Sequence, residues 1–260
     1  MIEVLVAAAA IVLPLRLEEG NVLVDASIDG KPVRLIVDTG GKGSLQLTAA
    51  AAARVGVKTD ETLVSRTDAL GNSYAGPGFA VGELEIAGTR FRNLPGFVRG
   101  EAAGGVTGPL PADGMLGMEF LRGYVARFDY AAKKLTLFSE DDRADAGPAC
   151  AGSPVVVFSH PLRFWLTAVQ TDHGLFRAIL DSGATYSIIS SATAAAAKLP
   201  LEDGLYRTAR LNLGTREVGP LDFVSVELNV AGADALLGYN FFERHVLCFD
   251  GPRGAVTIVS

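Results

Sequence analysis

Apolar and polar residues alternate over short runs along much of the 260-residue chain, and such alternation predicts half-buried β-strands. The runs at 33–37 and 176–180 show the pattern, with apolar side chains at every second position. Thirty glycines and twelve prolines fall in short clusters, where they indicate turns. After each run come a turn, a second short strand and an alanine-rich segment that predicts a small helix. The pattern therefore predicts a strand-rich chain with short helices.

A short motif occurs twice, at the end of each of these strands. Asp-Thr-Gly at 38–40 recurs as Asp-Ser-Gly at 181–183, an offset of 143 residues. The same offset places Thr48 on Ser191 and the alanines that follow Thr48 on a second alanine-rich segment. The repeat thus covers a strand, a turn, a second strand and a helix.

A second block repeats further along the chain. Residues 112–139 match residues 233–260 at an offset of 121, and each block contains a Phe-Asp turn between two alternating runs, typical of a hairpin. Two blocks in the same order at constant offsets indicate a tandem duplication. A charged and then Gly/Pro/Ala-rich linker separates the copies, so we expect one domain over 1–145 and another over 146–260.

The first copy has 22 more residues between its two blocks than the second. This extra region contains LGNSYAGPGFAVGEL, in which glycines and a proline surround one aromatic residue, Tyr74. Ser65–Thr67 and Phe79–Val81 flank the polar, glycine-rich residues, and this arrangement favours a long hairpin with its tip around 70–80. An ordinary surface loop is the alternative.

Each copy offers one acid at the end of a buried strand, Asp38 and Asp181. Either acid alone could be an ordinary turn residue. Two copies related by an approximate twofold axis, however, would bring the two carboxylates together, and such a pair shares a proton because both members cannot ionise. The ionised acid can take a proton from water while the protonated one donates to a carbonyl oxygen. This is the chemistry of amide hydrolysis without a metal or a covalent intermediate.

The residues around the acids fit that role. Gly40 and Gly183 allow backbone amides to approach the carboxylates, and the hydroxyls of Thr39 and Ser182 can tie the two turns together. Each motif is followed later by two apolar residues and a glycine, at 115–117 and 236–238.

With these motifs the chain resembles the aspartic protease clan, and within it bacterial retropepsin-like domains, here two in one chain as in pepsin. The resemblance covers nearly all of residues 12–260. It implies an all-β fold of two tandem β-barrel lobes with short helices and a pseudo-twofold axis. It also implies that Asp38 and Asp181 are the catalytic pair, that the hydroxyls of Thr39 and Ser182 interlock beneath it, and that Tyr74 belongs to a flap over bound peptide. Because both acids lie in one chain, we expect a functional monomer.

The chain departs from the pepsin pattern directly after each motif. Pepsin-like enzymes usually follow at least the first motif with Ser or Thr, whose hydroxyl favours an ionised aspartate. Gly41 and Ala184 provide no hydroxyl. We therefore expect a pH optimum milder than that of pepsin, weakly acidic to near neutral.

Composition and motifs exclude other classes. A net charge of −6 and a pI near 5.1 argue against nucleic acid as a partner. The three histidines lie apart, and no zinc, serine-hydrolase or nucleotide motif occurs, so we expect no metal and no cofactor. We interpret Phe164 and Trp165 as core residues and Lys42 as an exposed turn lysine.

Two features bear on the cellular compartment. Cys150 and Cys248 could form a disulfide in an oxidising compartment, whereas Cys248 could equally be a buried apolar residue. The apolar residues 1–15 have the length of a signal-peptide core but lack a preceding positive charge, and could instead be a first strand. We expect a periplasmic or secreted protein, with association to a membrane through this segment as the alternative.

Two functions remain. The first is an aspartic endopeptidase acting on peptide or protein substrates through a water activated between Asp38 and Asp181. The second is a catalytically silent two-lobed peptide-binding module. The presence of both acids favours the enzyme.

Overall fold

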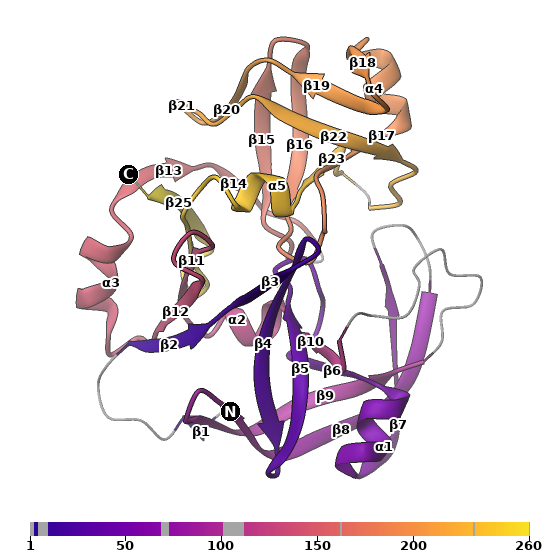
Figure 1. Ribbon diagram of the computed structural model, residues 1–260, viewed down its shortest axis with the longest axis vertical. Coiled ribbons are helices and arrows are strands. Elements are labelled where there is room, and N and C mark those ends of the chain that lie inside the picture. Colours follow the sequence, from indigo (N-terminus) through magenta and orange to yellow (C-terminus); the bar gives the residue numbers. More distant parts are fainter. Residues whose placement is uncertain are drawn as a thin grey trace.

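A computed structural model describes residues 3–4, 10–68, 73–100, 112–161, 163–230 and 232–259. Over these residues the chain forms three sheets (Figure 1). One sheet belongs to the N-terminal half, in the lower part of the view, and one to the C-terminal half, in the upper part. The third lies at one side and takes strands from both halves.

The N-terminal sheet has nine described strands. In spatial order they are β1 (Glu3–Val4), β9 (Thr89–Arg99), β6 (Leu45–Thr48), β10 (Gly114–Leu116), β5 (Lys31–Val37), β4 (Asn21–Ile28), β8 (Ser73–Ile86) and β7 (Thr59–Thr67), with β3 (Arg16–Glu18) beside β4. Two short helices, α1 (Ala49–Val55) and α2 (Met118–Leu121), follow β6 and β10.

The C-terminal sheet has ten described strands. Their order is β18 (Leu201–Glu202), β19 (Leu205–Thr208), β22 (Leu221–Val226), β17 (Ile188–Ser190), β23 (Ala235–Leu237), β16 (Gly174–Leu180), β15 (Leu166–Thr171), β20 (Leu211–Leu213) and β21 (Arg216–Glu217), with β14 (Val157–Phe158) on β15. Helices α4 (Ser191–Ala196) and α5 (Tyr239–Phe242) repeat the positions of α1 and α2 in the chain.

The third sheet joins the two copies. Its order is β13 (Gly152–Val155), β25 (Ala255–Val259), β24 (Leu247–Asp250), β11 (Val125–Asp129), β12 (Lys134–Phe138) and β2 (Ile11–Pro14). The predicted hairpins β11–β12 and β24–β25 meet edge to edge, and Arg127 pairs with Cys248, its own counterpart at the offset of 121. The approximate twofold axis therefore passes through this pair. The predicted domain boundary at 145 falls inside α3 (Arg143–Ala149), and the division into two domains stays a prediction.

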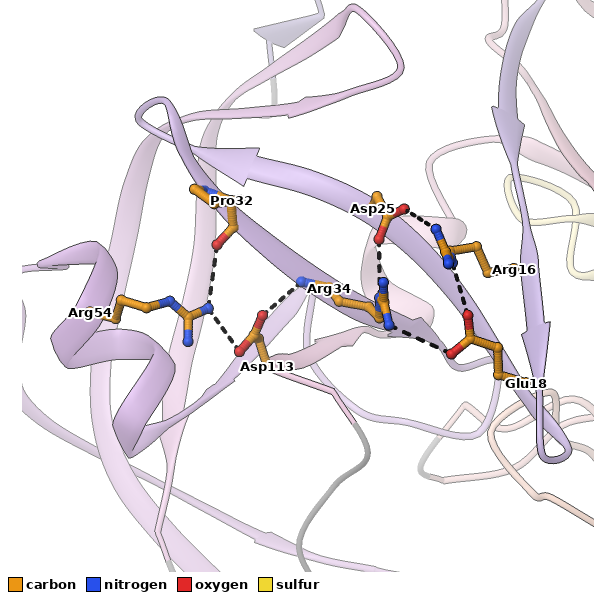
Figure 2. A network of polar contacts seen from close by, with 7 residues as sticks. All are labelled: Arg16, Glu18, Asp25, Pro32, Arg34, Arg54 and Asp113. Atoms are coloured by element: carbon orange, nitrogen blue, oxygen red, sulfur yellow. Dashed lines mark hydrogen bonds and ion pairs between the residues drawn. The ribbon is translucent and has the colours of Figure 1, made fainter.

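A polar contact is repeated in both lobes. The Asp113 carboxylate accepts the backbone N–H of Arg34 at 2.8 Å, and the Asp234 carboxylate accepts that of Arg177 at 2.8 Å. In the first lobe a wider network surrounds it, in which Arg54 bridges Asp113 and the Pro32 carbonyl (Figure 2). The network continues from Arg34 to Asp25, Glu18 and Arg16. These ion pairs are partly exposed, so each contributes at most about 1 kcal/mol.

The first copy is one residue longer than the second just after the Asp-Thr-Gly turn. Thr48 caps α1 by accepting the Ala51 N–H, and Ser190 caps α4 by accepting the Thr193 N–H. The cap positions are thus 142 residues apart, so the predicted match of Thr48 with Ser191 is wrong. The extra residue lies in the first lobe near Gly43, whose φ of 89° is in the left-handed region that favours glycine.

Cys150 and Cys248 form a disulfide, which decides between the two alternatives for these residues. It joins the segment after α3 to β24 and closes a loop of 98 residues. Replacing both by Ser should lower the free energy of unfolding by roughly 2–4 kcal/mol, because the unfolded chain gains freedom. Urea unfolding measures the loss. The midpoint of the double variant should not respond to reductant, whereas that of the unmodified chain should fall. Equal midpoints for all samples would contradict the prediction.

The N-terminal apolar run is described only in part. Residues 11–14 form strand β2, which pairs with β12 and buries Ile11 and Leu13. Among the described residues, no helix is long and apolar enough to cross a membrane.

Candidate active site

The two motif acids stand at equivalent points of the two lobes. Asp38 follows β5, which runs parallel to β10, and Asp181 follows β16, which runs parallel to β23. The Asp38 N–H donates to the Leu116 carbonyl at 2.9 Å, and the Asp181 N–H donates to the Leu237 carbonyl at 3.0 Å. Each acid is therefore fixed by the strand that carries the downstream glycine block of its own copy.

Four hydrogen bonds interlock the turns of the two lobes. The Thr39 hydroxyl donates to the Leu180 carbonyl at 2.8 Å and accepts the Ser182 N–H at 2.9 Å. Reciprocally, the Ser182 hydroxyl donates to the Val37 carbonyl at 2.8 Å and accepts the Thr39 N–H at 2.9 Å. Both hydroxyl residues are fully buried. The interlock holds the two acids in one fixed relation.

The glycine after each hydroxyl residue faces the acid of the opposite lobe. A side-chain carbon at Gly40 would lie 2.5 Å from Cγ of Asp181, and one at Gly183 would lie 2.3 Å from Cγ of Asp38. The backbone also approaches the acid of its own lobe: the Gly40 and Gly41 N–H groups donate to Asp38 Oδ1 at 2.8 and 2.6 Å, and the Gly183 N–H donates to Asp181 Oδ1 at 2.9 Å. Only glycine leaves room for both approaches.

Gly183→Ala should therefore displace the Asp38 carboxylate and lower any dyad-dependent kcat/KM by about a hundredfold, since a displacement near 1 Å costs that much. Gly147→Ala is the matched control, because a side-chain carbon there meets nothing within 4 Å. Steady-state kinetics on one peptide compares the two variants. Unchanged kinetics in Gly183→Ala would show that the carboxylate position is not critical.

The environment raises the pKa of both carboxyl groups. Burial raises the pKa of Asp38 above its ordinary value, while a hydrogen bond from Asp181, the Gly40 and Gly41 amides and the Arg99 charge oppose the rise. Burial, the negative charge of Asp38 and the shared hydrogen bond raise the pKa of Asp181 much further. As the pH rises, the pair therefore loses its first proton from Asp38, and Asp181 keeps the remaining proton.

The acids open into a cavity of about 240 Å³ at the seam of the lobes. Its lining is mainly apolar and comes from both halves of the chain; it includes Ile36, Met115, Phe164, Ile188 and Leu236. Tyr74 and Arg99 lie on the side of the β7–β8 hairpin. Such an enclosed apolar site with a few convergent polar groups is suited to binding a ligand.

Comparison with known proteins gives two matches of different extent. A family model for aspartyl proteases matches residues 24–120. The crystal structure of the aspartic proteinase from Irpex lacteus is similar over the whole molecule, with a TM-score of 0.64, 13% identity, and coverage of 97% of this chain and 97% of that chain. These two matches support assignment of the chain to the aspartic protease clan. No curated protein matches it. The predicted all-β, two-lobed fold is confirmed.

The segment predicted to form a flap is a long hairpin in the structure. β7 and β8 pair antiparallel up to Thr67 and Ser73, and residues 69–72 at the predicted tip lie outside the described residues. Tyr74 is buried in the dyad cavity, where its ring stacks on Phe97 and lies 4.5 Å from the Arg99 guanidinium carbon. Its role as a flap residue stays a prediction. In the C-terminal lobe the hairpin that follows α4 is short: β18 and β19 pair only Leu201 with Tyr206 and Glu202 with Leu205.

Two residues of the cavity differ from their sequence interpretation. Lys42 is half-buried rather than exposed, and its ammonium lies 5.6 Å from the centre of the Phe164 ring. Phe164 is buried, but it lines the cavity with the dyad instead of only filling the core. Trp165 is in the core, as predicted. Arg99 is a further site residue that the sequence pattern does not indicate, because β9, which pairs with both β6 and β8, brings it to the cavity beside Thr48.

In the described part of the chain, no three His, Cys, Asp or Glu side chains lie close enough together to form a metal site.

The structure brings together all seven predicted site residues: the dyad, its two hydroxyl residues, its two glycines and Tyr74.

Proposed function

We propose that the chain is an aspartic endopeptidase that hydrolyses peptide bonds with a water activated between Asp38 and Asp181. The observation that carries this proposal is the placement of both acids, with unequal pKa values, at one end of an apolar cavity. The match of residues 24–120 to the aspartyl protease family supports a peptide or protein substrate.

The two acids take different roles in this reaction. Ionised Asp38 accepts a proton from the water while the water oxygen attacks the carbonyl carbon of the substrate. Protonated Asp181 donates its proton to the carbonyl oxygen. The product of this step is a neutral tetrahedral diol, with the proton now on Asp38. That proton then passes to the peptide nitrogen as the C–N bond breaks, and Asp181 recovers a proton from the diol. No covalent bond forms between protein and substrate.

The test is incubation of the purified chain with a diverse peptide mixture from pH 3 to pH 8, with and without a statine-type inhibitor. Mass spectrometry identifies new termini. Cleavage that the inhibitor blocks supports the endopeptidase. Intact protein that binds peptides without cleaving them at any pH would instead support the silent peptide-binding module.

The rate should peak at weakly acidic to near-neutral pH. It should rise as Asp38 ionises above the ordinary carboxyl pKa and fall as Asp181 loses its proton, because both pKa values are raised. Gly41 has no hydroxyl that could favour the ionised form of Asp38, as the Ser or Thr of pepsin-like enzymes does. A side-chain carbon at position 41 would lie 2.5 Å from Asp38 Oδ2. The pH profile of kcat/KM measures the optimum, and a maximum below about pH 3 would contradict this account.

Arg99→Gln extends the same test. Loss of this cation should move the acidic limb of the profile to higher pH, because Arg99 lowers the pKa of Asp38. The control is Arg90→Gln, whose guanidinium is exposed on β9 and pairs with Glu85. An unmoved limb in Arg99→Gln would show that the guanidinium does not act on the dyad.

We also propose that the chain acts as a monomer, since it supplies both acids, and that it is exported to the periplasm or medium. The Cys150–Cys248 disulfide supports export, because oxidising compartments preserve disulfides. Analytical ultracentrifugation and fractionation of the producing cell test the two points. A dimer with lower activity on dilution, or a cytoplasmic location, would contradict them.

A further inference from the structure

A second hollow adjoins the dyad cavity. It has a volume of about 400 Å³ and is lined by Lys42, Ser65, Arg66, Thr67, Glu119 and Arg163, with Pro161. Lys42 and Thr67 line both hollows. A peptide whose scissile bond lies at the dyad can therefore extend past Lys42 into this second hollow, which we name the Lys42 groove.

The Lys42 groove is rich in positive charge. Three of its residues are cationic, Lys42, Arg66 and Arg163, and one, Glu119, is acidic. None of the ion pairs between described residues includes any of the three cations. This contrasts with the network of Figure 2, in which arginines and acids pair with one another.

Aromatic rings hold two of these cations in place. The Lys42 ammonium lies 5.6 Å from the centre of the Phe164 ring, and the Arg66 guanidinium carbon lies 5.5 Å from the centre of the Phe97 ring. Arg66 also pairs with Tyr74 across the β7–β8 hairpin, so it is part of the hairpin that lines the dyad cavity. Positioning of this kind reduces the entropy that the side chains lose when a ligand binds.

Arg66 has an unused donor. Its Nε is buried and has no hydrogen-bond partner among the described residues, while Nη1 donates to the Ser65 carbonyl at 3.0 Å. A buried donor without an acceptor is costly, and an arriving acceptor removes that cost. A carboxylate is the acceptor that a guanidinium binds best.

Lys42 and Arg66 also act on one another. Burial and the Arg66 charge lower the pKa of Lys42, and Glu119 opposes the change. The two cations therefore repel each other in a half-buried site. A carboxylate placed between them would relieve this repulsion.

We propose that Lys42 and Arg66 bind an acidic side chain of the substrate, so that the preferred peptides carry apolar residues at the scissile bond and an Asp or Glu in the Lys42 groove. The apolar preference follows from the lining of the dyad cavity, and the acidic one from the groove. This inference rests on the proposed endopeptidase function.

A binding experiment tests the preference independently of cleavage. Apolar peptides that contain statine are prepared with Glu, Gln or Lys at each flanking position in turn, and calorimetry gives their Kd. At one position or more, Glu should bind roughly tenfold more tightly than Lys, the size expected of a charge-assisted hydrogen bond. Lys42→Glu and Arg66→Glu should each abolish or reverse the preference.

Lys58→Glu is the matched control. It makes the same change in net charge at an exposed position of the same lobe, outside both hollows, and should keep the preference for Glu. Circular dichroism confirms that each variant is folded. Preference for Glu in all three variants, absence of a preference in the unmodified chain, or failure of every peptide to bind would overturn the inference.

Cleavage of the same series with a peptide bond in place of statine separates the two proposals. Cleavage without preference for Glu would overturn the inference and leave the endopeptidase intact. Binding with the preference but without cleavage would overturn the endopeptidase and support acid recognition by the cleft.

Discussion

Asp38→Asn and Asp181→Asn should each lower kcat/KM by roughly a thousandfold or more, since each removes one of the two proton-transfer groups. The amide cannot accept the proton of the water at position 38, and cannot donate an acidic proton at position 181. The double variant should be no worse than either single variant by more than a small factor, because residues that act as one unit are not additive. Kinetics on a single peptide at the optimal pH measures all three.

Loss of activity must be separated from loss of the fold. Asp203→Asn is the control substitution, at an exposed turn residue. Stability gives a second control: because the pKa of Asp181 is raised in the folded state, the folded chain binds more protons than the unfolded one above the ordinary carboxyl pKa. The unmodified chain therefore loses stability as pH rises from about 4 through the raised pKa. Asp181→Asn should escape part of that loss and remain folded at pH 7. Activity retained in either acid variant would contradict the shared dyad.

Thr39→Val should lower the free energy of unfolding by roughly 2–5 kcal/mol, the second large effect. The substitution keeps the shape of the side chain but removes the hydroxyl that serves the Leu180 carbonyl and the Ser182 N–H. Both groups are then buried without a partner at the seam of the lobes, and the dyad should lose its geometry as well. Chemical unfolding measures the stability, and the peptide assay measures the activity.

Two further variants identify the hydroxyl as the cause. Thr39→Ser should restore most of the stability, because the second lobe itself uses a serine, Ser182, at the equivalent position. Thr59→Val, on exposed β7, controls for the substitution and should change stability little. If Thr39→Val were as stable as the unmodified chain, the interlock would contribute nothing to the joining of the lobes.

Much of this architecture could be predicted from the repeated pattern, because each repeated residue has a local physical task. Asp38 and Asp181 each end a buried strand, and Gly40 and Gly183 each face a carboxylate. Such tasks depend on neighbours along the chain and on the twofold axis that the duplication implies. The same reasoning predicts the two hairpins that meet at Arg127 and Cys248, because each contains a repeated Phe-Asp turn between alternating strands.

The remaining features depend on contacts that no repeat encodes. Its position in the chain predicts that Lys42 is an exposed turn residue, but its ammonium lies against the Phe164 ring of the other half. Arg99 reaches the cavity through the pairing of β9 with β6, where it lies opposite Thr48. The one-residue shift near Gly43 became visible only in the cap positions of α1 and α4. Likewise, the spacing of Cys150 and Cys248 left their pairing open until the structure placed them together.

In the proposed reaction a water held between Asp38 and Asp181 attacks the peptide bond directly. The most direct measurement is cleavage of one peptide by the purified chain in water enriched with oxygen-18, with mass spectrometry of the products and of the intact protein during turnover. The account predicts an oxygen-18 atom in the new carboxyl group and a protein mass that never changes. A peptidyl adduct on the protein, or no cleavage by folded protein at any pH from 3 to 8, would contradict it.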